Sequence, residues 1–134
     1  MRKLLTIIFF FLFTTSNSFA SGGVGDLKLS DNVISNFQKY LSYRKPVVFL
    51  VTTDGQNSVG WKCPYSRCVT TGSMNEKKLC SRRFATNCEI FALRRSVKWK
   101  NSFSKNVSAK DKKFSSKDSI PEIKSKLILL GFLD

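Results

Sequence analysis

The apolar positions in the range 31–42 recur with the spacing of one helix face, at i, i+4, i+7 and i+8. This pattern predicts an amphipathic helix that buries one side. Ser30 or Asp31 can cap its start, and Pro46 prevents it from extending further. The residues of the apolar face are Val33, Phe37, Tyr40 and Leu41.

The next two segments have the patterns of strands. The range 47–53 is rich in β-branched residues and almost wholly apolar, which is typical of a strand buried on both faces at the centre of a sheet. Asp54-Gly55 is a turn signal. The range 58–63 then alternates, with Val59, Trp61 and Cys63 on one face, so we expect a β-hairpin.

A second helix and a third strand follow. Ser73 and Glu76 have the spacing of a capping box, which predicts a helix that runs to about Thr86 with Asn87 at a left-handed end. The range 88–99 is predicted as one strand with strict alternation. One face would carry Phe91, Leu93, Val97 and Trp99, and the other Arg94, Ser96 and Lys98.

The composition changes after residue 100 to lysine, serine and asparagine, so we expect a mobile basic linker over 101–118. Ser119 and Glu122 then repeat the capping-box spacing, which opens a short helix within 119–134 that ends at Gly131. A short amphipathic helix with lysines either docks on its own domain or a partner, or lies on an anionic membrane surface.

The N-terminal residues 1–20 have the features of a secretory signal peptide: a basic start, an apolar run over 4–13, and small residues at positions 18 and 20. We expect the mature chain to begin at Ser21 and to work in the periplasm or outside the cell. The Gly-rich range 21–30 is predicted to be flexible. The sequence thus predicts an exported, disulfide-stabilised α+β domain over 31–100, with the order helix, β-hairpin, helix, strand.

Charge limits the possible partners. The chain has 23 basic and nine acidic residues; two of the basic ones lie in residues 1–20, so residues 21–134 carry a formal charge of +12. Such a charge favours an anionic surface, whether lipid phosphate, a polyanion or an acidic protein, although it also serves solubility. The chain has no histidine, the commonest general base and zinc ligand.

The four cysteines are Cys63, Cys68, Cys80 and Cys88. An even number in a small exported domain predicts two disulfides, and we favour Cys80–Cys88 with Cys63–Cys68 because each pair brackets one turn. Cross-pairing of the hairpin end to the helix is the alternative. A zinc site or a redox pair fits less well, because the spacings are not those of zinc knuckles or of Cys-x-x-Cys.

A basic and aromatic segment is the candidate for binding an anionic partner. It comprises Arg94, Arg95, Lys98, Lys100, Trp61, Tyr65 and Trp99. Alternatively, the tryptophans belong to the core and the arginines form a solvated face. Arg95 breaks the alternation of its strand, so either a carboxylate pairs with it or a bulge turns it to solvent. The carboxylates considered are Asp54, Glu76 and Glu89.

The range 61–99 resembles small exported bacterial proteins of unknown function. The likeness rests on a tryptophan before Cys-Pro, a helix with one cysteine, and a second cysteine before an Ile-Phe-Ala strand. The residues are Trp61, Cys63-Pro64, Cys68, Cys80, Cys88 and Ile90-Phe91-Ala92. The resemblance implies a disulfide-stabilised α+β module and brings no active site with it.

Catalytic motifs are missing from the sequence: it has no Gly-rich phosphate loop and no Gly-x-Ser-x-Gly. The leading prediction is therefore a non-catalytic binding module for an anionic envelope component or a partner protein, without a cofactor or a metal. The alternatives are a small secreted hydrolase or nuclease-like toxin, and an inhibitor of an enzyme with an acidic active site.

Overall fold

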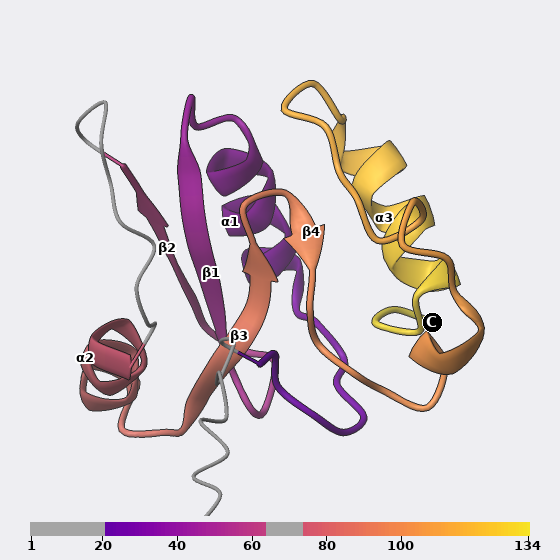
Figure 1. The fold of residues 1–134 in the computed structure, drawn as a ribbon. Helices are drawn as coiled ribbons and strands as arrows, with labels where there is room; N and C mark the ends of the chain where they lie inside the picture. Colours follow the sequence, from indigo (N-terminus) through magenta and orange to yellow (C-terminus); the bar gives the residue numbers. More distant parts are fainter. Residues whose placement is uncertain (1–20, 64–73) are drawn as a thin grey trace, which may run out of the picture.

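The computed structural model describes residues 21–63 and 74–134. They form an α+β fold in which a four-stranded antiparallel sheet of order β2-β1-β3-β4 separates α2 from the other two α-helices (Figure 1). Among the described residues, no helix is long and apolar enough to cross a membrane. The helices are α1 (Asp31–Leu41), α2 (Met74–Phe84), α3 (Ile120–Leu129) and the 3₁₀ helix η1 (Ser104–Asn106). The strands are β1 (Pro46–Thr52), β2 (Ser58–Lys62), β3 (Cys88–Leu93) and β4 (Ser96–Val97).

Two cores lie on opposite faces of the sheet. The main core packs α1 and α3 against the sheet and is built around the rings of Phe37, Tyr40, Phe49, Phe91, Phe114 and Phe132. The second core packs α2 against the other face and consists of Val48, Leu50, Cys80, Cys88 and Ile90. β1 contributes to both cores, as its apolar composition predicted for the central strand.

The predicted first helix is confirmed as α1. The Ser30 hydroxyl accepts a hydrogen bond from the Val33 N–H at 3.4 Å, which is the expected N-cap. The predicted apolar face is buried, together with Ile34, against the sheet and α3. Burial of this stripe is what holds an eleven-residue helix together, because a helix of this length is marginal alone in water.

A β-bulge in β3 changes which residues face each core. Phe49 of β1 pairs with Ala92, and the next residue, Leu50, pairs with Ile90. Phe91 of β3 therefore has no partner in β1 and is the extra residue of the bulge. Phe91 therefore packs in the main core and Leu93 against the second core, so the prediction that both lie on one face was wrong. The predicted single strand over 88–99 was also wrong, because it is divided by a turn.

That turn consists of Arg94 and Arg95, which connect Leu93 to Ser96 across the β3–β4 pair. A related difference occurs at the end of α2, where Ala85 and not Asn87 takes the left-handed conformation, with φ of 51°. Strict alternation and residue preference both fail here because tertiary pairing determines where the chain reverses.

The disulfide between Cys80 of α2 and Cys88 of β3 confirms one of the two predicted bonds. Both cysteines are buried in the second core, so the bond joins the helix to the sheet. Cys63 is disulfide-bonded as well. Its predicted partner Cys68 lies outside the described residues, as do Tyr65 and the predicted cap Ser73.

The range 21–30 is packed rather than flexible, which corrects the prediction. The Gly23 N–H donates to the Ile90 carbonyl at 2.9 Å, and the Lys100 N–H donates to the Gly23 carbonyl at 2.8 Å. A Cβ at Gly23 would lie 2.5 Å from the indole ring of Trp99, so only glycine permits this close approach. Leu27 and Leu29 further along this segment are buried in the main core.

The predicted mobile linker, 101–118, is likewise held in place. Phe114 is 6% exposed and its ring centroid lies 5.2 Å from that of Phe37. The Asn101 side-chain amide donates to the Leu130 carbonyl at 2.8 Å. The lysine and serine content suggested disorder, but one aromatic anchor and one buried amide suffice to fix the segment on the domain.

The C-terminal helix α3 docks on its own domain, which is one of the alternatives that the sequence predicted. Ser119 and Glu122 form the predicted capping box. At the other end, Gly131 has φ of 80° and the Phe132 N–H donates to the Leu127 carbonyl, which is a Schellman stop. This stop directs Phe132 into the main core.

Loss of the Cys80–Cys88 bond should destabilise the fold. The bond closes a loop with a sequence separation of eight, so the chain-entropy model gives about 2–3 kcal/mol. We expect Cys80→Ala with Cys88→Ala to lower the free energy of unfolding by that amount in urea titrations. Free thiols in the denatured, unreduced wild-type protein, or unchanged stability of the variant, would contradict this.

The ionised carboxylate of Asp118 should stabilise the fold at neutral pH, and this contribution should be lost in acid. Burial raises the pKa of this carboxyl, but hydrogen bonds from Lys126 and from the Ser115 N–H outweigh burial and lower the pKa overall. A carboxyl whose pKa is lower in the folded protein than in the unfolded one stabilises the fold. This stabilisation is complete above the pKa in the unfolded protein, about 3.9, and is lost as the pH falls through the pKa in the folded protein. We expect Asp118→Asn to lower Tm at pH 7 and to match the wild type near pH 2.

The matched control is Asp134→Asn, because the Lys28–Asp134 pair is exposed and such pairs contribute little. Its Tm should follow the wild type at every pH. A constant Tm difference for Asp118→Asn from pH 7 to pH 2 would show that the charge of Asp118 is not the cause.

Candidate anion-binding surface

Three segments lie at the end of the sheet that is at the top of Figure 1: the end of β2, the start of β1 and the β3–β4 turn. The antiparallel order brings these ends together, and Lys62 pairs with Pro46. The Cys63 N–H donates to the Lys45 carbonyl at 2.8 Å, and the Arg94 N–H donates to the Val47 carbonyl at 2.9 Å. Segments far apart in the sequence therefore meet at this end.

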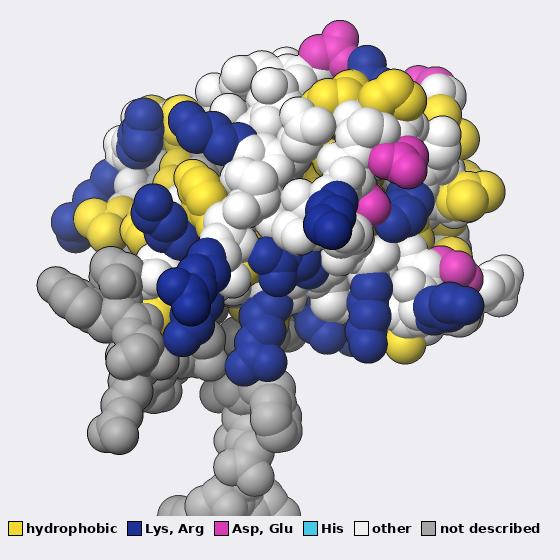
Figure 2. All heavy atoms as spheres, turned by 90° about the horizontal axis from the view of Figure 1, so that it is seen from above, with side chains coloured by type: hydrophobic (Ala, Val, Ile, Leu, Met, Phe, Trp, Pro, Cys, Tyr) yellow, Lys and Arg dark blue, Asp and Glu magenta, His cyan; other side chains and the backbone are white. Residues whose placement is uncertain are grey.

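Basic residues gather at this end from each of its three segments. Lys113 joins them because it forms a β-bridge with Ser96, next to the turn. Since neighbouring strands lie about 4.8 Å apart, Lys62 and Arg94, which flank β1, have backbones roughly 10 Å apart. Figure 2 looks onto this end and shows Lys and Arg side chains in a band across it. We name this surface the basic edge: Arg44, Lys45, Lys62, Arg94, Arg95 and Lys113.

Among the described residues, no carboxylate forms an ion pair with Arg44, Lys62, Arg94 or Lys113 of the basic edge. The four ion pairs found in the described chain use other lysines: Lys28, Lys77, Lys124 and Lys126. Lys62 lies over the ring of Tyr43, with its Nζ 5.2 Å from the ring centroid. Asp111 is the acidic residue nearest in sequence to Lys113, and it accepts a hydrogen bond from the Ser108 hydroxyl. These four side chains of the basic edge therefore present positive charge that no described carboxylate neutralises.

Arg95 differs from its neighbours because its side chain is half-buried and its guanidinium is hydrogen-bonded to the backbone. Its Nε donates to the Leu41 carbonyl at 3.0 Å and its Nη2 to the Tyr43 carbonyl at 2.6 Å. Leu41 is the last residue of α1, where helix carbonyls lack helical partners, and Tyr43 lies just beyond the helix. The expected carboxylate partners and the expected bulge were both wrong. Arg95 holds α1 against the turn and is a structural residue of the edge.

Tyr40 lies beneath the basic edge and does not offset its charge. Burial raises the pKa of the Tyr40 hydroxyl far above its usual value, and the nearby positive charge of Arg95 opposes this only in part. The hydroxyl is buried and has no hydrogen-bond partner among the described residues. Tyr40 is therefore neutral near pH 7.

The remaining predicted site residues lie elsewhere. Lys98 and Lys100 are exposed but sit further along the sheet, where the Lys98 N–H donates to the Phe91 carbonyl. Trp99 between them is 3% exposed and donates from Nε1 to the Gly25 carbonyl at 2.8 Å. Its indole ring belongs to the main core and offers no face to a ligand. Trp61 is half-buried against the second core.

The sequence pattern therefore found Arg94 and Arg95 but not the other members of the basic edge. A usable signal was present in the hairpin. Counting outward from the Asp54-Gly55 turn places Lys62 opposite Val47, and hence close to Arg44 and Lys45; a register shift between Pro46 and Val48 then pairs Lys62 with Pro46. The contribution of Lys113 had no local signal, because it depends on how the segment 101–118 packs.

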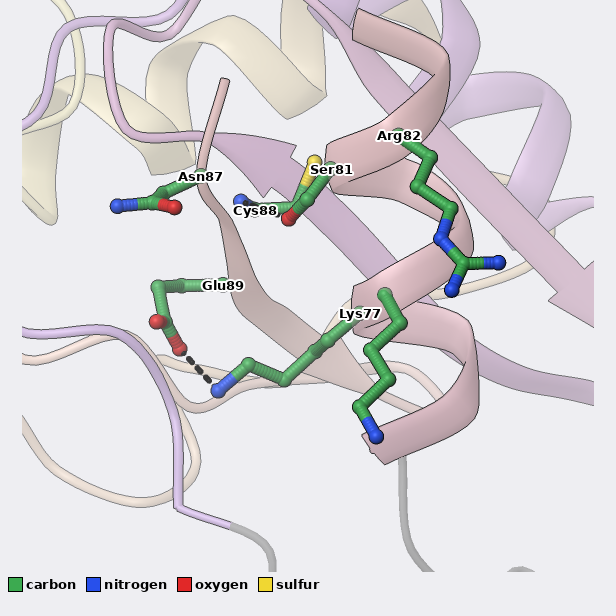
Figure 3. A pocket seen from close by; sticks show the side chains of 7 residues that line it. Lys77, Ser81, Arg82, Asn87, Cys88 and Glu89 are labelled. Atoms are coloured by element: carbon green, nitrogen blue, oxygen red, sulfur yellow. Dashed lines mark hydrogen bonds and ion pairs between the residues drawn. The ribbon is translucent and has the colours of Figure 1, made fainter. Parts of the chain in front are cut away.

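A pocket of about 400 Å³ lies between α2 and the start of β3 (Figure 3). Lys77 there is paired with Glu89 at 2.6 Å, and the Ser81 hydroxyl accepts from the Cys88 N–H at 3.1 Å. Arg82 also projects from α2, but its side chain extends away from Glu89. The cations of this pocket are partly neutralised and do not converge, so it fits an anion less well than the basic edge. Its lining residues are Lys77, Lys78, Ser81, Arg82, Asn87, Cys88 and Glu89.

Comparisons of the chain with protein-family models, curated proteins and solved structures find no match. The resemblance to small exported bacterial proteins thus stays a prediction. Within residues 21–63 and 74–134, no group of three or more histidine, cysteine or carboxylate side chains is placed to hold a metal ion. The charge and geometry of the basic edge are therefore what indicate a function.

Arg95 should matter for stability and Lys98 should not. We expect Arg95→Met, which keeps an apolar stem but loses both hydrogen bonds, to lower the free energy of unfolding by about 2 kcal/mol. Lys98→Met removes the same charge from an exposed position and should change it by less than about 0.5 kcal/mol. Urea unfolding midpoints measure both, and equal values for the two variants would contradict the structural role of Arg95.

Proposed function

We propose that this chain is an exported, non-catalytic binding protein that docks on an anionic envelope component or partner through the basic edge. The observation that supports this proposal is that exposed cations from separate segments, without a carboxylate partner among the described residues, converge on one end of the sheet: Arg44, Lys62, Arg94 and Lys113. The buried disulfide is compatible with the oxidising compartment that export implies.

The charges at the basic edge are held on ordered backbone. Lys62 ends a strand, and Arg94 occupies a two-residue turn whose N–H is bonded to β1. An ordered cation loses less conformational entropy on binding than one on a mobile tail. The formal charge of +12 on residues 21–134 adds a long-range attraction that speeds encounter with a polyanion.

A hydrolase or nuclease has less support from this arrangement. Of the described carboxylates, Glu89 is paired with Lys77, Asp118 with Lys126 and Glu122 with the Ser119 cap. These three acids already have structural partners, and they lie on different elements. They therefore do not form the pair of neighbouring acid and base groups that general acid–base catalysis uses. An inhibitor of an enzyme with an acidic active site would use the same basic edge, so it differs from the proposal only in its partner.

The proposal predicts salt-sensitive binding that localises to the basic edge. Binding of the purified protein to inorganic polyphosphate should weaken steeply with salt, because each neutralised phosphate releases counterions. The triple variant Arg44→Gln, Lys62→Gln and Arg94→Gln should reduce the slope of log K against log[salt] by about 2, since roughly 0.7 is lost per contact. Fluorescence anisotropy with labelled polyphosphate measures this.

The control removes the same charge from α2, with Lys78→Gln, Arg82→Gln and Arg83→Gln. These three side chains are exposed, and two of them line the pocket beside β3. We expect the control to bind nearly as the wild type does. Equal losses from both triple variants would show that charge acts in bulk, and a loss from the control alone would move the site to the pocket.

A further inference from the structure

Arg94 has a backbone conformation that its residue type disfavours. Its φ is 54°, in the left-handed region where the Cβ of an ordinary residue is crowded. Two-residue hairpin turns normally place asparagine, aspartate or glycine at such positions. Among the described residues other than glycine, only Arg94 and Ala85 have positive φ.

The fold makes no use of the Arg94 side chain. It is exposed, and among the described residues it forms no hydrogen bond, ion pair or ring contact; only its backbone N–H is bonded, to the Val47 carbonyl. A glycine or asparagine would keep that backbone bond and relieve the strain. A strained residue with an unused functional group at a surface tip points to a role outside the fold.

The adjacent arginine shows the contrast within one turn. The Arg95 guanidinium donates hydrogen bonds to the Leu41 and Tyr43 carbonyls. These bonds fix the turn against α1, while the Arg94 N–H fixes it against β1. Arg94 therefore extends an unused guanidinium from a backbone that is held from two sides, so its backbone is already ordered before a ligand binds.

We propose that Arg94 is the residue that determines specificity at the basic edge, and that it binds phosphate groups through the paired N–H donors of its guanidinium. This inference rests on the proposed binding of a polyanion. A guanidinium presents a planar fork of donors that matches two oxygens of one phosphate, whereas a lysine offers only a compact charge.

Phosphate fits this site better than carboxylate does. A carboxylate has only two oxygens, so any further cation must share the same two oxygens that the fork of Arg94 binds. A phosphate keeps further oxygens that can accept from the neighbouring cations of the basic edge, such as Lys62, whose backbone lies roughly 10 Å away, a span that long side chains can close. Free polyphosphate and the headgroups of an anionic bilayer share this chemistry.

Three variants test the inference. Arg94→Gly removes both the strain and the guanidinium, Arg94→Lys keeps the strain and the charge but removes the fork, and Ala85→Gly relieves the same kind of strain at the end of α2 as a control. The probes are inorganic polyphosphate, vesicles that contain phosphatidylglycerol, and poly-L-glutamate matched in charge. Tm and the dissociation constant at fixed salt are measured for each protein.

We expect Arg94→Gly and Ala85→Gly each to raise Tm by about 3 °C, because both relieve a left-handed residue. Arg94→Gly should weaken polyphosphate binding about tenfold and Arg94→Lys about fivefold, while Ala85→Gly should bind as the wild type does. The wild type should prefer polyphosphate to poly-L-glutamate. Binding to the vesicles as well would indicate a lipid phosphate, and binding to polyphosphate alone a soluble one.

If Arg94→Lys binds polyphosphate as tightly as the wild type does, the guanidinium fork is not needed for binding. A fall in Tm for Arg94→Gly would overturn the claim that the fold does not need this side chain. Equal affinity for poly-L-glutamate would overturn the preference for phosphate. If the wild type binds none of the three probes, the proposed function itself fails, which is distinct from a wild type that binds and variants that do not differ.

Discussion

The ring of Phe37 is the contact on which the rest of this fold depends. It packs at centroid distances of 5.0–6.1 Å against four other rings: Tyr40, Phe49, Phe91 and Phe114. These come from α1 itself, from β1, from β3 and from the segment after η1. Aromatic pairs at such distances add about 0.5–1.5 kcal/mol each beyond the area they bury. One side chain thus joins every layer of the main core.

This core also determines where the charges of the basic edge lie. Phe114 enters the main core, and its N–H donates to the Arg95 carbonyl at 2.8 Å, so the neighbouring Lys113 is carried to the β3–β4 turn. Arg95 meanwhile ties that turn to the end of α1, which carries Phe37. The basic edge is therefore rigid because aromatic packing on one side of the sheet fixes the loops that present it.

Local signals in the sequence predicted much of the fold, and contacts between distant segments explain the failures. The Ser30 cap and the Gly131 stop depend on a few neighbouring residues, so they could be predicted. The bulge at Phe91 depends on pairing with β1, and the order of residues 101–118 depends on Phe114 meeting Phe37. The same limit applies to the site, because Arg94 was visible in the sequence while Lys113 reaches it only through tertiary packing.

Clustering cations at one end of the sheet costs the fold little, which makes a role in binding compatible with stability. Two unit charges 10 Å apart repel by about 0.4 kcal/mol in water, and physiological salt screens most of that because the Debye length is about 8 Å. The aromatic core and the Cys80–Cys88 bond exceed this cost several-fold. The same low cost means that charge alone is weak evidence for a site. The strained and unused Arg94 is stronger evidence, because a residue chosen only for solubility could sit at any relaxed surface position.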